Sequence, residues 1–155
     1  MSTEIERKFL VNGTAWRQGD GLELSQGYLH RDKARTVRVR IAGDQGYLTI
    51  KGATKGMSRA EFEYEIPLPD AQQLLKLCDG PIIQKVQRVS TYQGKTWEID
   101  EFFGDNTGLV IAEIELQDEN EQFQLPDWVG KEVTEDPRYS NASLVTYPYS
   151  MWRDQ

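Results

Sequence analysis

The stretch EIERKF at residues 4–9 decides the fold, because its charged residues fall on alternate positions. Glu4, Glu6 and Lys8 share one set of positions, and Ile5 and Phe9 share the other. A period of two is typical of a β-strand, whose successive side chains point to opposite faces of the sheet. The same alternation recurs at 37–41, 48–51, 59–66, 97–100 and 112–116. The pattern predicts a sheet with one charged face and one apolar face.

The expected secondary structure is mainly β (α+β). Eight strands are expected, at 3–11, 24–30, 35–42, 46–52, 59–67, 82–90, 95–101 and 109–117. The turn at 43–46 joins the third and fourth as an antiparallel hairpin. Helices are expected at 70–77 and 118–123, and short helical turns at 127–152. Mostly antiparallel connections favour an eight-stranded closed β-barrel with a few peripheral helices, since closure removes exposed edges.

Length and composition narrow the class of protein. The 155 residues fit a single domain spanning 1–155, with no apolar run long enough for a signal peptide or a membrane span. A soluble, cytoplasmic protein is expected, and a homodimer is a reasonable expectation. The net charge of -7 argues against a nucleic-acid partner. Cys78, the single cysteine, lies in an apolar run and is expected to fill core space.

Two interpretations of the charged face remain open. In the first, apolar residues such as Phe9 and Val39 point into the barrel and the charges are solvated. In the second, the charges line the lumen, and helices and C-terminal turns cover the apolar outer face. Paired like charges about 7 Å apart on one strand face, as at Glu4 and Glu6 or Arg38 and Arg40, favour the second, because they repel unless an opposite charge lies between them.

The charges of such a lumen suit a densely charged anion bound with cations. The basic residues would be Lys8, Arg38, Arg40, Lys51, Arg59 and Lys85. The acidic residues would be Glu4, Glu6, Glu61, Glu63, Glu98, Asp100, Glu113 and Glu115. Their net charge is -2, which two divalent cations would change to +2. Mg2+ or Mn2+ prefers such oxygen ligands, whereas one histidine, His30, and one cysteine argue against zinc.

The opening stretch resembles the signature of the CYTH superfamily, the triphosphate tunnel metalloenzymes, in which Glu, any residue, Glu, any residue, Lys begins the first strand. Further matching segments are QGYL at 26–29, VRVR at 37–40, LTIKG at 48–52, Arg59 with Glu61 and Glu63, WEID at 97–100, AEIE at 112–115, and KEVT at 131–134 followed by Arg138 and Tyr139. The resemblance implies an eight-stranded antiparallel tunnel that binds a small polyphosphate with Mg2+ or Mn2+. It therefore selects the interpretation with the charges inside.

The chain looks like the short bacterial branch of this family, which hydrolyses inorganic triphosphate to pyrophosphate and phosphate. Other members are class IV adenylate cyclases and thiamine, nucleoside or RNA triphosphatases, and a polyphosphate-binding module without catalysis is an alternative of another class. The metal ligands that the resemblance implies are Glu4, Glu6 and Glu115, with Asp100 and Glu113 near a second metal. The implied phosphate ligands are Lys8, Arg38, Arg40, Lys51 and Lys85, to which the charge pattern adds Arg59. Glu61, Glu63 and Glu98 form the acidic wall.

The expected catalytic residues are Glu113, Asp100, Lys51 and Tyr28. Glu113 or Asp100 is the expected proton acceptor. Tyr28 is expected to point inward, where it either hydrogen-bonds Lys51 and gates one end or is an ordinary strand aromatic. One position departs from the family pattern, because Gln87 stands two residues after Lys85 where relatives usually carry arginine. Alternation predicts that Gln87 faces the tunnel and Arg88 faces outward, unless a bulge reorients Arg88.

Overall fold

The computed structural model describes residues 2–154 and contains one antiparallel sheet there. Its strands are β1 (Ser2–Val11), β2 (Leu22–Arg31), β3 (Arg35–Ala42), β4 (Gln45–Gly52), β5 (Ser58–Ile66), β6 (Asp79–Tyr92), β7 (Lys95–Phe102), β8 (Val110–Glu115) and β9 (Val129–Glu132). The α-helices are α1 (Leu68–Lys76) and α2 (Asn141–Thr146). Short 3-10 turns are η1 (Gly104–Asn106), η2 (Pro137–Tyr139) and η3 (Tyr149–Met151). No helix in this part of the chain is long and apolar enough to cross a membrane.

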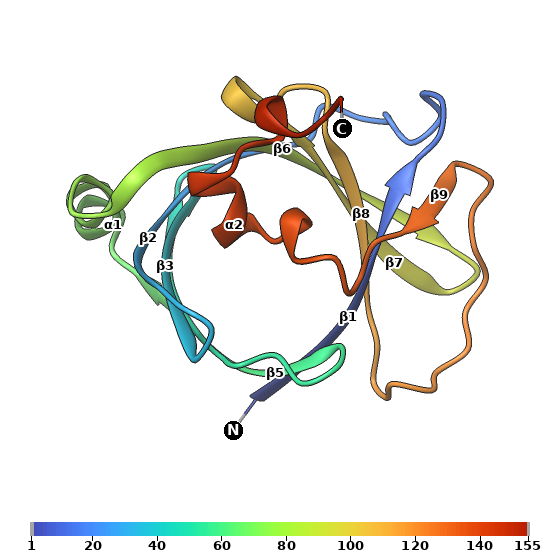
Figure 1. Cartoon of the computed structure of the whole chain (residues 1–155), viewed down its shortest axis with the longest axis horizontal. Coiled ribbons are helices and arrows are strands. Elements are labelled where there is room, and N and C mark those ends of the chain that lie inside the picture. The colour runs from blue at the N-terminus through green and yellow to red at the C-terminus, as the bar shows by residue number, and fades with distance from the viewer. Residues whose placement is uncertain (1, 155) are drawn as a thin grey trace.

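The sheet closes on itself through β1 (Figure 1). Its spatial order is β5-β4-β3-β2-β6-β7-β8-β1, and the first residues of β1 pair with β5 to complete the ring. The later residues of β1 pair with β8 on one side and with the short β9 on the other. The predicted closed antiparallel barrel of eight strands is therefore confirmed, with β9 as an addition outside the ring.

Two sequence predictions of local structure were wrong. Residues 118–123 form turns instead of a helix, because the Asp118 carboxylate accepts a hydrogen bond from the backbone N–H of Asn120 at 2.7 Å. Such a side-chain bond to the nearby backbone competes with a helix. The stretch 127–152, where only helical turns were expected, also contributes β9, which is stabilised by pairing with β1.

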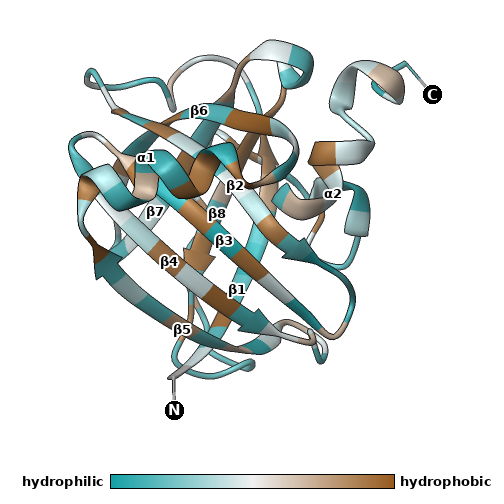
Figure 2. Ribbon diagram, turned by 90° about the vertical axis from the view of Figure 1, so that its left-hand side faces the viewer, coloured by the Kyte–Doolittle hydropathy of each residue, from teal (hydrophilic) through white to brown (hydrophobic). Residues whose placement is uncertain are grey.

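Alternating hydropathy along β3, β4 and β5 gives each strand two unlike faces (Figure 2). On the outside of β1, β7 and β8 lies an apolar outer cluster of Phe9, Trp16, Trp97, Ile99, Ala112, Ile114 and Leu116. Phe123 and Trp128, from the segment between β8 and β9, pack against it. Helix α1 packs outside β2, β3 and β4. Ile50, Phe62 and Tyr64 on β4 and β5 remain exposed, so the apolar outer face is only partly covered.

Only the start of the C-terminal segment, with Trp128 and Val129, covers the outer face as predicted, and the rest of the segment does not. It crosses the opening of the barrel (Figure 1) and packs into an end cluster of Tyr28, Ile83, Phe102, Leu109, Ile111, Val133, Tyr139, Leu144, Val145 and Trp152. Ile83 and Phe102 lie two residues from the charged Lys85 and Asp100, so they share the inward face of their strands. The end cluster therefore closes one end of the interior with apolar side chains.

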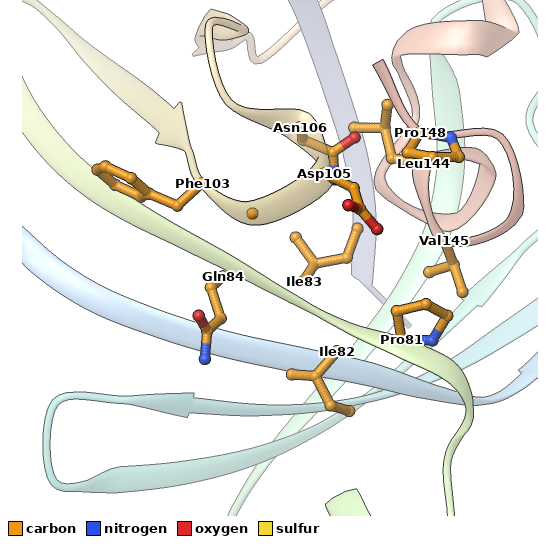
Figure 3. Close-up of a pocket in the computed structure, with 11 residues that line it drawn as sticks. Pro81, Ile82, Ile83, Gln84, Phe103, Asp105, Asn106, Leu144, Val145 and Pro148 are labelled. Atoms are coloured by element: carbon orange, nitrogen blue, oxygen red, sulfur yellow. The ribbon is translucent and has the colours of Figure 1, made fainter. Parts of the chain in front are cut away.

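The packing leaves one small cavity beside α2 and brings β2 close to α1 at Gly27. A cavity of about 50 Å³ remains where α2 meets β6 and η1, lined by Ile83, Asn106 and Leu144 among others (Figure 3). On the outer side, Gly27 lets β2 approach the end of α1, since a Cβ there would lie 2.7 Å from Ile82 Cδ1 and 2.9 Å from Cys78 Sγ. Cys78 is partly buried against this glycine, which agrees with a space-filling role.

Candidate active site

Cross-strand pairing gathers the predicted site residues on the inner face of the barrel. Residues directly opposite one another on neighbouring strands share a face. The pairs are Glu4–Arg59, Glu6–Glu115, Lys8–Glu113, Glu98–Glu113, Gln87–Asp100, Leu24–Lys85, Gln26–Arg40, Arg38–Thr49, Thr49–Glu63 and Lys51–Glu61. These pairs link all eight strands of the ring. The charged residues therefore line the interior, as the second interpretation of the sequence requires.

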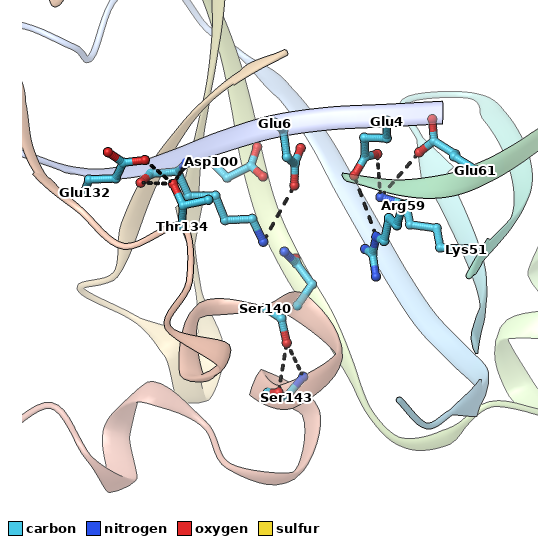
Figure 4. Close-up of polar contacts among 12 residues, drawn as sticks. Glu4, Glu6, Lys51, Arg59, Glu61, Asp100, Glu132, Thr134, Ser140 and Ser143 are labelled. Atoms are coloured by element: carbon cyan, nitrogen blue, oxygen red, sulfur yellow. Dashed lines mark hydrogen bonds and ion pairs between the residues drawn. The ribbon is translucent and has the colours of Figure 1, made fainter. Parts of the chain in front are cut away.

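Two buried lysines are held by carboxylates at opposite parts of this lining. Lys51 Nζ lies 2.8 Å from Glu4 Oε2 and 3.3 Å from Glu61 Oε2 (Figure 4). Lys85 Nζ lies 2.7 Å from Asp100 Oδ2, and both of these side chains are at most 3% exposed. Each lysine keeps further N–H donors, so such pairs fix the ammonium group without using its whole hydrogen-bonding capacity.

A hydrogen bond between Glu4 and Glu61 shifts the pKa values of the two carboxyl groups in opposite directions. Burial opposes the ionisation of Glu4, but the charges of Lys51 and Arg59 and the hydrogen bonds from Glu61 and Lys51 outweigh it and lower the pKa of Glu4 to about 2. Burial and the hydrogen bond with Glu4 raise the pKa of Glu61 to about 7. Arg59 Nε lies 3.8 Å from Glu4 Oε1, which adds to the stabilisation of the Glu4 carboxylate.

A second group of carboxylates lies on β1, β7 and β8 and has less cationic compensation. Burial raises the pKa of Glu113 to about 8, and the charge of Glu6 and a hydrogen bond with it act in the same direction. Lys8 opposes this effect; its Nζ lies 3.7 Å from Glu6 Oε1. Burial and neighbouring carboxylates also raise the pKa of Glu98 and Glu115. Negative charge is thus in excess here.

This carboxylate group fits a hard cation by its chemistry. Among residues 2–154, no three Asp, Glu, His or Cys side chains converge into a ready-made metal site. Instead, Glu4 is paired with Lys51, and the raised pKa of Glu113, to which a hydrogen bond with Glu6 contributes, favours its protonated form. A metal ion binds the deprotonated forms of its ligands and displaces such protons. The lining therefore supplies suitable oxygen donors whose charge is balanced by lysine and by protons.

The titration of Glu113 gives a prediction for stability without metal. Its folded-state pKa of about 8 lies above the ordinary value of 4.5, so the folded protein retains a proton that the unfolded chain loses between these values. This group therefore lowers stability progressively as pH rises from 4.5 to about 8. Glu113→Gln removes this loss and should raise the Tm at pH 8 by several degrees, since about 1 kcal/mol corresponds to about 2–4 °C at this size.

Thermal unfolding in chelator at pH 5.5 and pH 8 measures this effect. Wild type should lose more Tm between the two pH values than Glu113→Gln. Glu23→Gln is the matched control, because Glu23 is exposed on β2 beside the inward-facing Leu24. An equal decline in wild type and Glu113→Gln would show that Glu113 ionises normally.

Basic side chains on β3 provide unsatisfied donors toward the interior. Arg38 is buried; its Nη2 lies 3.3 Å from Thr49 Oγ1 and 3.5 Å from Glu63 Oε2, while its Nε has no hydrogen-bond partner among the described residues. Arg40 donates from Nε to Gln26 Oε1 at 3.0 Å. A buried donor without a partner is costly, so an anion in the interior would relieve that cost.

Four neutral residues complete the lining, and of these only Gln87 was predicted to face the interior. Gln26 and Thr49 are fully buried, and Gln87 donates from Nε2 to Asp100 Oδ1 at 3.0 Å. Asn141, from α2, accepts from Lys85 Nζ at 3.0 Å. The period-two pattern would have indicated the first three, since each shares the register of a charged neighbour. Asn141 carries no such signal, because it lies outside the barrel strands.

The predicted orientation at the departure from the family pattern is confirmed. Gln87 faces the interior beside Asp100, whereas Arg88 faces outward and donates from Nη1 to Glu101 Oε1 at 2.9 Å and from Nε to the carbonyl of Gly19 at 3.2 Å. No bulge interrupts the pairing of β6 with β7 at these residues.

The neutral Gln87 leaves room for one more charged contact. Gln87→Arg should lower KM for a polyphosphate substrate by roughly 10-fold, because a hydrogen bond to a charged group exceeds a neutral one in strength. Steady-state kinetics measures KM, with Arg88→Ala as the outward control that should change little. An unchanged KM for Gln87→Arg would place residue 87 away from the bound phosphates.

Tyr28 does not make the hydrogen bond with Lys51 that was one of its two predicted alternatives. It is 5% exposed and belongs to the end cluster, and it has no hydrogen bond with Lys51 among residues 2–154. Lys51 instead bonds Glu4 and Glu61. The structure thus favours the interpretation of Tyr28 as an ordinary apolar wall residue. His30, at the exposed end of β2, bonds Asp32 and is remote from the lining, as expected.

An antiparallel tunnel lined by carboxylates, lysines and arginines defines the class of protein. The chain belongs to the CYTH family, whose domain model matches residues 2–149. It is 51% identical to an inorganic triphosphatase of Acetivibrio thermocellus over 99% of this chain and all of that protein. It is also 34% identical to an inorganic triphosphatase of Nitrosomonas europaea over 92% of this chain and 97% of that protein.

A solved structure of an inorganic triphosphatase is also similar to this chain in its fold. The crystal structure of an inorganic triphosphatase matches with a TM-score of 0.66 and 33% identity, covering 94% of this chain and 95% of that one. Both the sequence relatives and the barrel geometry therefore point to the same family.

Proposed function

We propose that this protein is a metal-dependent triphosphatase that hydrolyses inorganic triphosphate to pyrophosphate and phosphate. The observation that carries the proposal is the lining of one closed barrel, where the buried Arg38 and Lys85 and the partly buried Arg40 lie across from the carboxylates of β1 and β8. Such a lining suits a compact, densely charged anion. Near full-length identity of 51% to an inorganic triphosphatase supports the same substrate.

The basic residues would bind the phosphate oxygens. Arg38 and Arg40 keep guanidinium donors that their protein partners do not use, and charge-assisted bonds from such donors to phosphate are strong. Lys8, Lys51, Arg59 and Lys85 surround the same interior. Their pairing with carboxylates holds them in position before substrate arrives, which lowers the ordering cost of binding.

The acidic residues would hold Mg2+ or Mn2+, and we propose two ions. Glu4, Glu6 and Glu115 would be ligands of one, with Asp100 and Glu113 near the other. The bound cations would neutralise phosphate oxygens and lower the pKa of the attacking water. Glu61, Glu63 and Glu98 would complete the acidic wall, where burial and the hydrogen bond with Glu4 raise the pKa of Glu61.

Water would attack a terminal phosphorus in line with the leaving pyrophosphate. Glu113 is the better of the two expected proton acceptors, because both oxygens of Asp100 already accept hydrogen bonds, from Lys85 and Gln87. Arg38 and Arg40 would stabilise charge on the transferred group and on the leaving pyrophosphate. A cytoplasmic location and a homodimer remain predictions from the sequence.

A substrate panel tests the proposed function. Phosphate release is measured from inorganic triphosphate, ATP and thiamine triphosphate, each with Mg2+, Mn2+ or chelator. Inorganic triphosphate with a divalent cation should give the fastest turnover. Faster turnover of ATP, or cyclic AMP as the main product, would move the assignment to a nucleotide enzyme on the same scaffold. Binding without any turnover would indicate a polyphosphate-binding module.

A further inference from the structure

We propose that Asn141, the first residue of α2, is a positioning residue of the phosphate site. Its carboxamide oxygen holds the ammonium group of Lys85 and, through Gln26, the guanidinium group of Arg40. The C-terminal segment thereby completes a site that is otherwise built from strands. The inference rests on the proposed function, because it concerns the binding of the same triphosphate.

A continuous set of hydrogen bonds joins these residues. Lys85 Nζ and Gln26 Nε2 both donate to Asn141 Oδ1, each at 3.0 Å. Gln26 Oε1 in turn accepts from Arg40 Nε at 3.0 Å. Gln26 is 0% exposed and Lys85 is 3% exposed, so water does not substitute freely for these partners. One amide oxygen from α2 therefore contacts β2 and β6 directly and β3 through Gln26.

Donor chemistry fixes the orientation of both amides. Arginine and lysine side chains only donate hydrogen bonds, so Arg40 must meet the oxygen of Gln26 and Lys85 must meet the oxygen of Asn141. The nitrogen of Gln26 then faces Asn141, as observed. The two lone pairs of Asn141 Oδ1 are used by Lys85 and Gln26. The network has one consistent direction, from the two cations toward the Asn141 oxygen.

This arrangement leaves the cations with donors for a ligand. Lys85 has three N–H groups, of which one is directed to Asp100 and one to Asn141. The third remains for a phosphate oxygen, in a direction that the first two determine. Arg40 uses Nε for Gln26 and keeps its terminal nitrogens. Asn141 orients both groups without adding negative charge. A second aspartate beside Lys85 would add one.

Capping and packing of α2 hold Asn141 in position. Ser140 caps α2, since its side chain accepts from the backbone N–H of Ser143 at 3.1 Å. Leu144 and Val145, on the following turn, are 1% and 4% exposed in the end cluster. These contacts fix the start of α2 against the barrel interior, so the amide of Asn141 is held by packing that lies outside the phosphate site.

A double-mutant cycle between Asn141 and Lys85 tests the proposal. Asn141→Ala should lower kcat/KM for inorganic triphosphate by on the order of 10-fold, mostly through KM, because Lys85 loses one of its two orienting partners. In a Lys85→Ala background the same change should cost clearly less, because the effects of residues that act through one another are not additive. Equal costs in both backgrounds would overturn the proposal.

Two further variants separate positioning from folding. Ser143→Ala removes the hydroxyl group that bonds the capping side chain of Ser140 at 2.8 Å, without touching Lys85 or Gln26, and it should leave kcat/KM within about twofold of wild type. Asn141→Asp keeps an acceptor oxygen and should retain the wild-type Tm, while its added negative charge weakens triphosphate binding at least as much as alanine does. Wild-type affinity in Asn141→Asp would show that residue 141 lies away from the phosphates.

Calorimetric titration of a non-hydrolysable triphosphate analogue in the presence of Mg2+ gives a readout that does not depend on turnover. Weaker binding by Asn141→Ala than by Ser143→Ala supports the inference even if wild type hydrolyses another substrate faster. Equal binding by the two variants contradicts it. A wild type that binds triphosphate without hydrolysing it would instead contradict the proposed function alone.

Discussion

Replacement of Glu6 by alanine is expected to lower kcat/KM for inorganic triphosphate by on the order of 10³-fold. Glu6 lies on β1 opposite Glu115 and is hydrogen-bonded to Glu113, at the centre of the excess negative charge. Loss of one metal carboxylate there removes charge stabilisation of several kcal/mol, and about 4 kcal/mol corresponds to 10³ in rate. The fold should persist, because the change relieves repulsion between neighbouring carboxylates.

Phosphate release at saturating Mg2+ measures this loss, and thermal unfolding confirms that the variant is folded. Glu23→Ala is the matched control, since Glu23 is an exposed acid on a barrel strand. Near wild-type turnover by Glu6→Ala would mean that β1 does not supply a metal ligand, and the interior assignment of its charges to metal binding would fail.

Arg38→Ala is expected to lower kcat by about 10²- to 10³-fold, the range for loss of one donor to a developing negative charge. Arg38 is buried and its Nη2 bonds Thr49, but its Nε has no partner among residues 2–154, so the Nε donor is not consumed by the protein. KM should change less than kcat if the interaction strengthens in the transition state.

Arg88→Ala is the matched comparison for Arg38→Ala. Both arginines lie on barrel strands, but Arg88 binds Glu101 and the Gly19 carbonyl on the outside. Steady-state kinetics of the two variants should therefore differ by at least tenfold in kcat. Similar rates for both would mean that Arg38 makes no contact with the reacting phosphates.

The barrel and the side on which its charges lie could be predicted because both follow from local alternation. A period of two places Glu4, Glu6 and Lys8 on one face, and the same parity separates Gln87 from Arg88. Like-charge spacing then indicated which face is inside. These properties depend on neighbouring residues of one strand, so the sequence displays them directly.

Features that depend on contacts distant in sequence could not be predicted in the same way. The four residues of β9 form a strand only because β1 offers an unpaired edge there. The C-terminal segment packs into the barrel opening because apolar residues such as Ile83 and Phe102 end the charged lining. Asn141 reaches Lys85 across 56 positions of sequence, which no local pattern signals.

Protonation adjusts the interior charge that was counted from the sequence. The fully ionised side chains give a net charge of -2, but pKa values of about 7 for Glu61 and about 8 for Glu113 leave protons on this lining near neutral pH. Divalent cations would take the place of those protons. Metal affinity should accordingly increase as pH rises toward 8, in the same interval in which the metal-free protein loses stability.

Hydrolysis of inorganic triphosphate in ¹⁸O-enriched water, followed by ³¹P NMR, tests the central claim most directly. With Mg2+ the products should be phosphate and pyrophosphate in equal amounts, with the label only in phosphate, because water attacks a terminal phosphorus. Chelation should stop the reaction. No turnover of inorganic triphosphate, label in pyrophosphate, or full activity in chelator would contradict a metal-dependent attack on the terminal phosphoryl group in this tunnel.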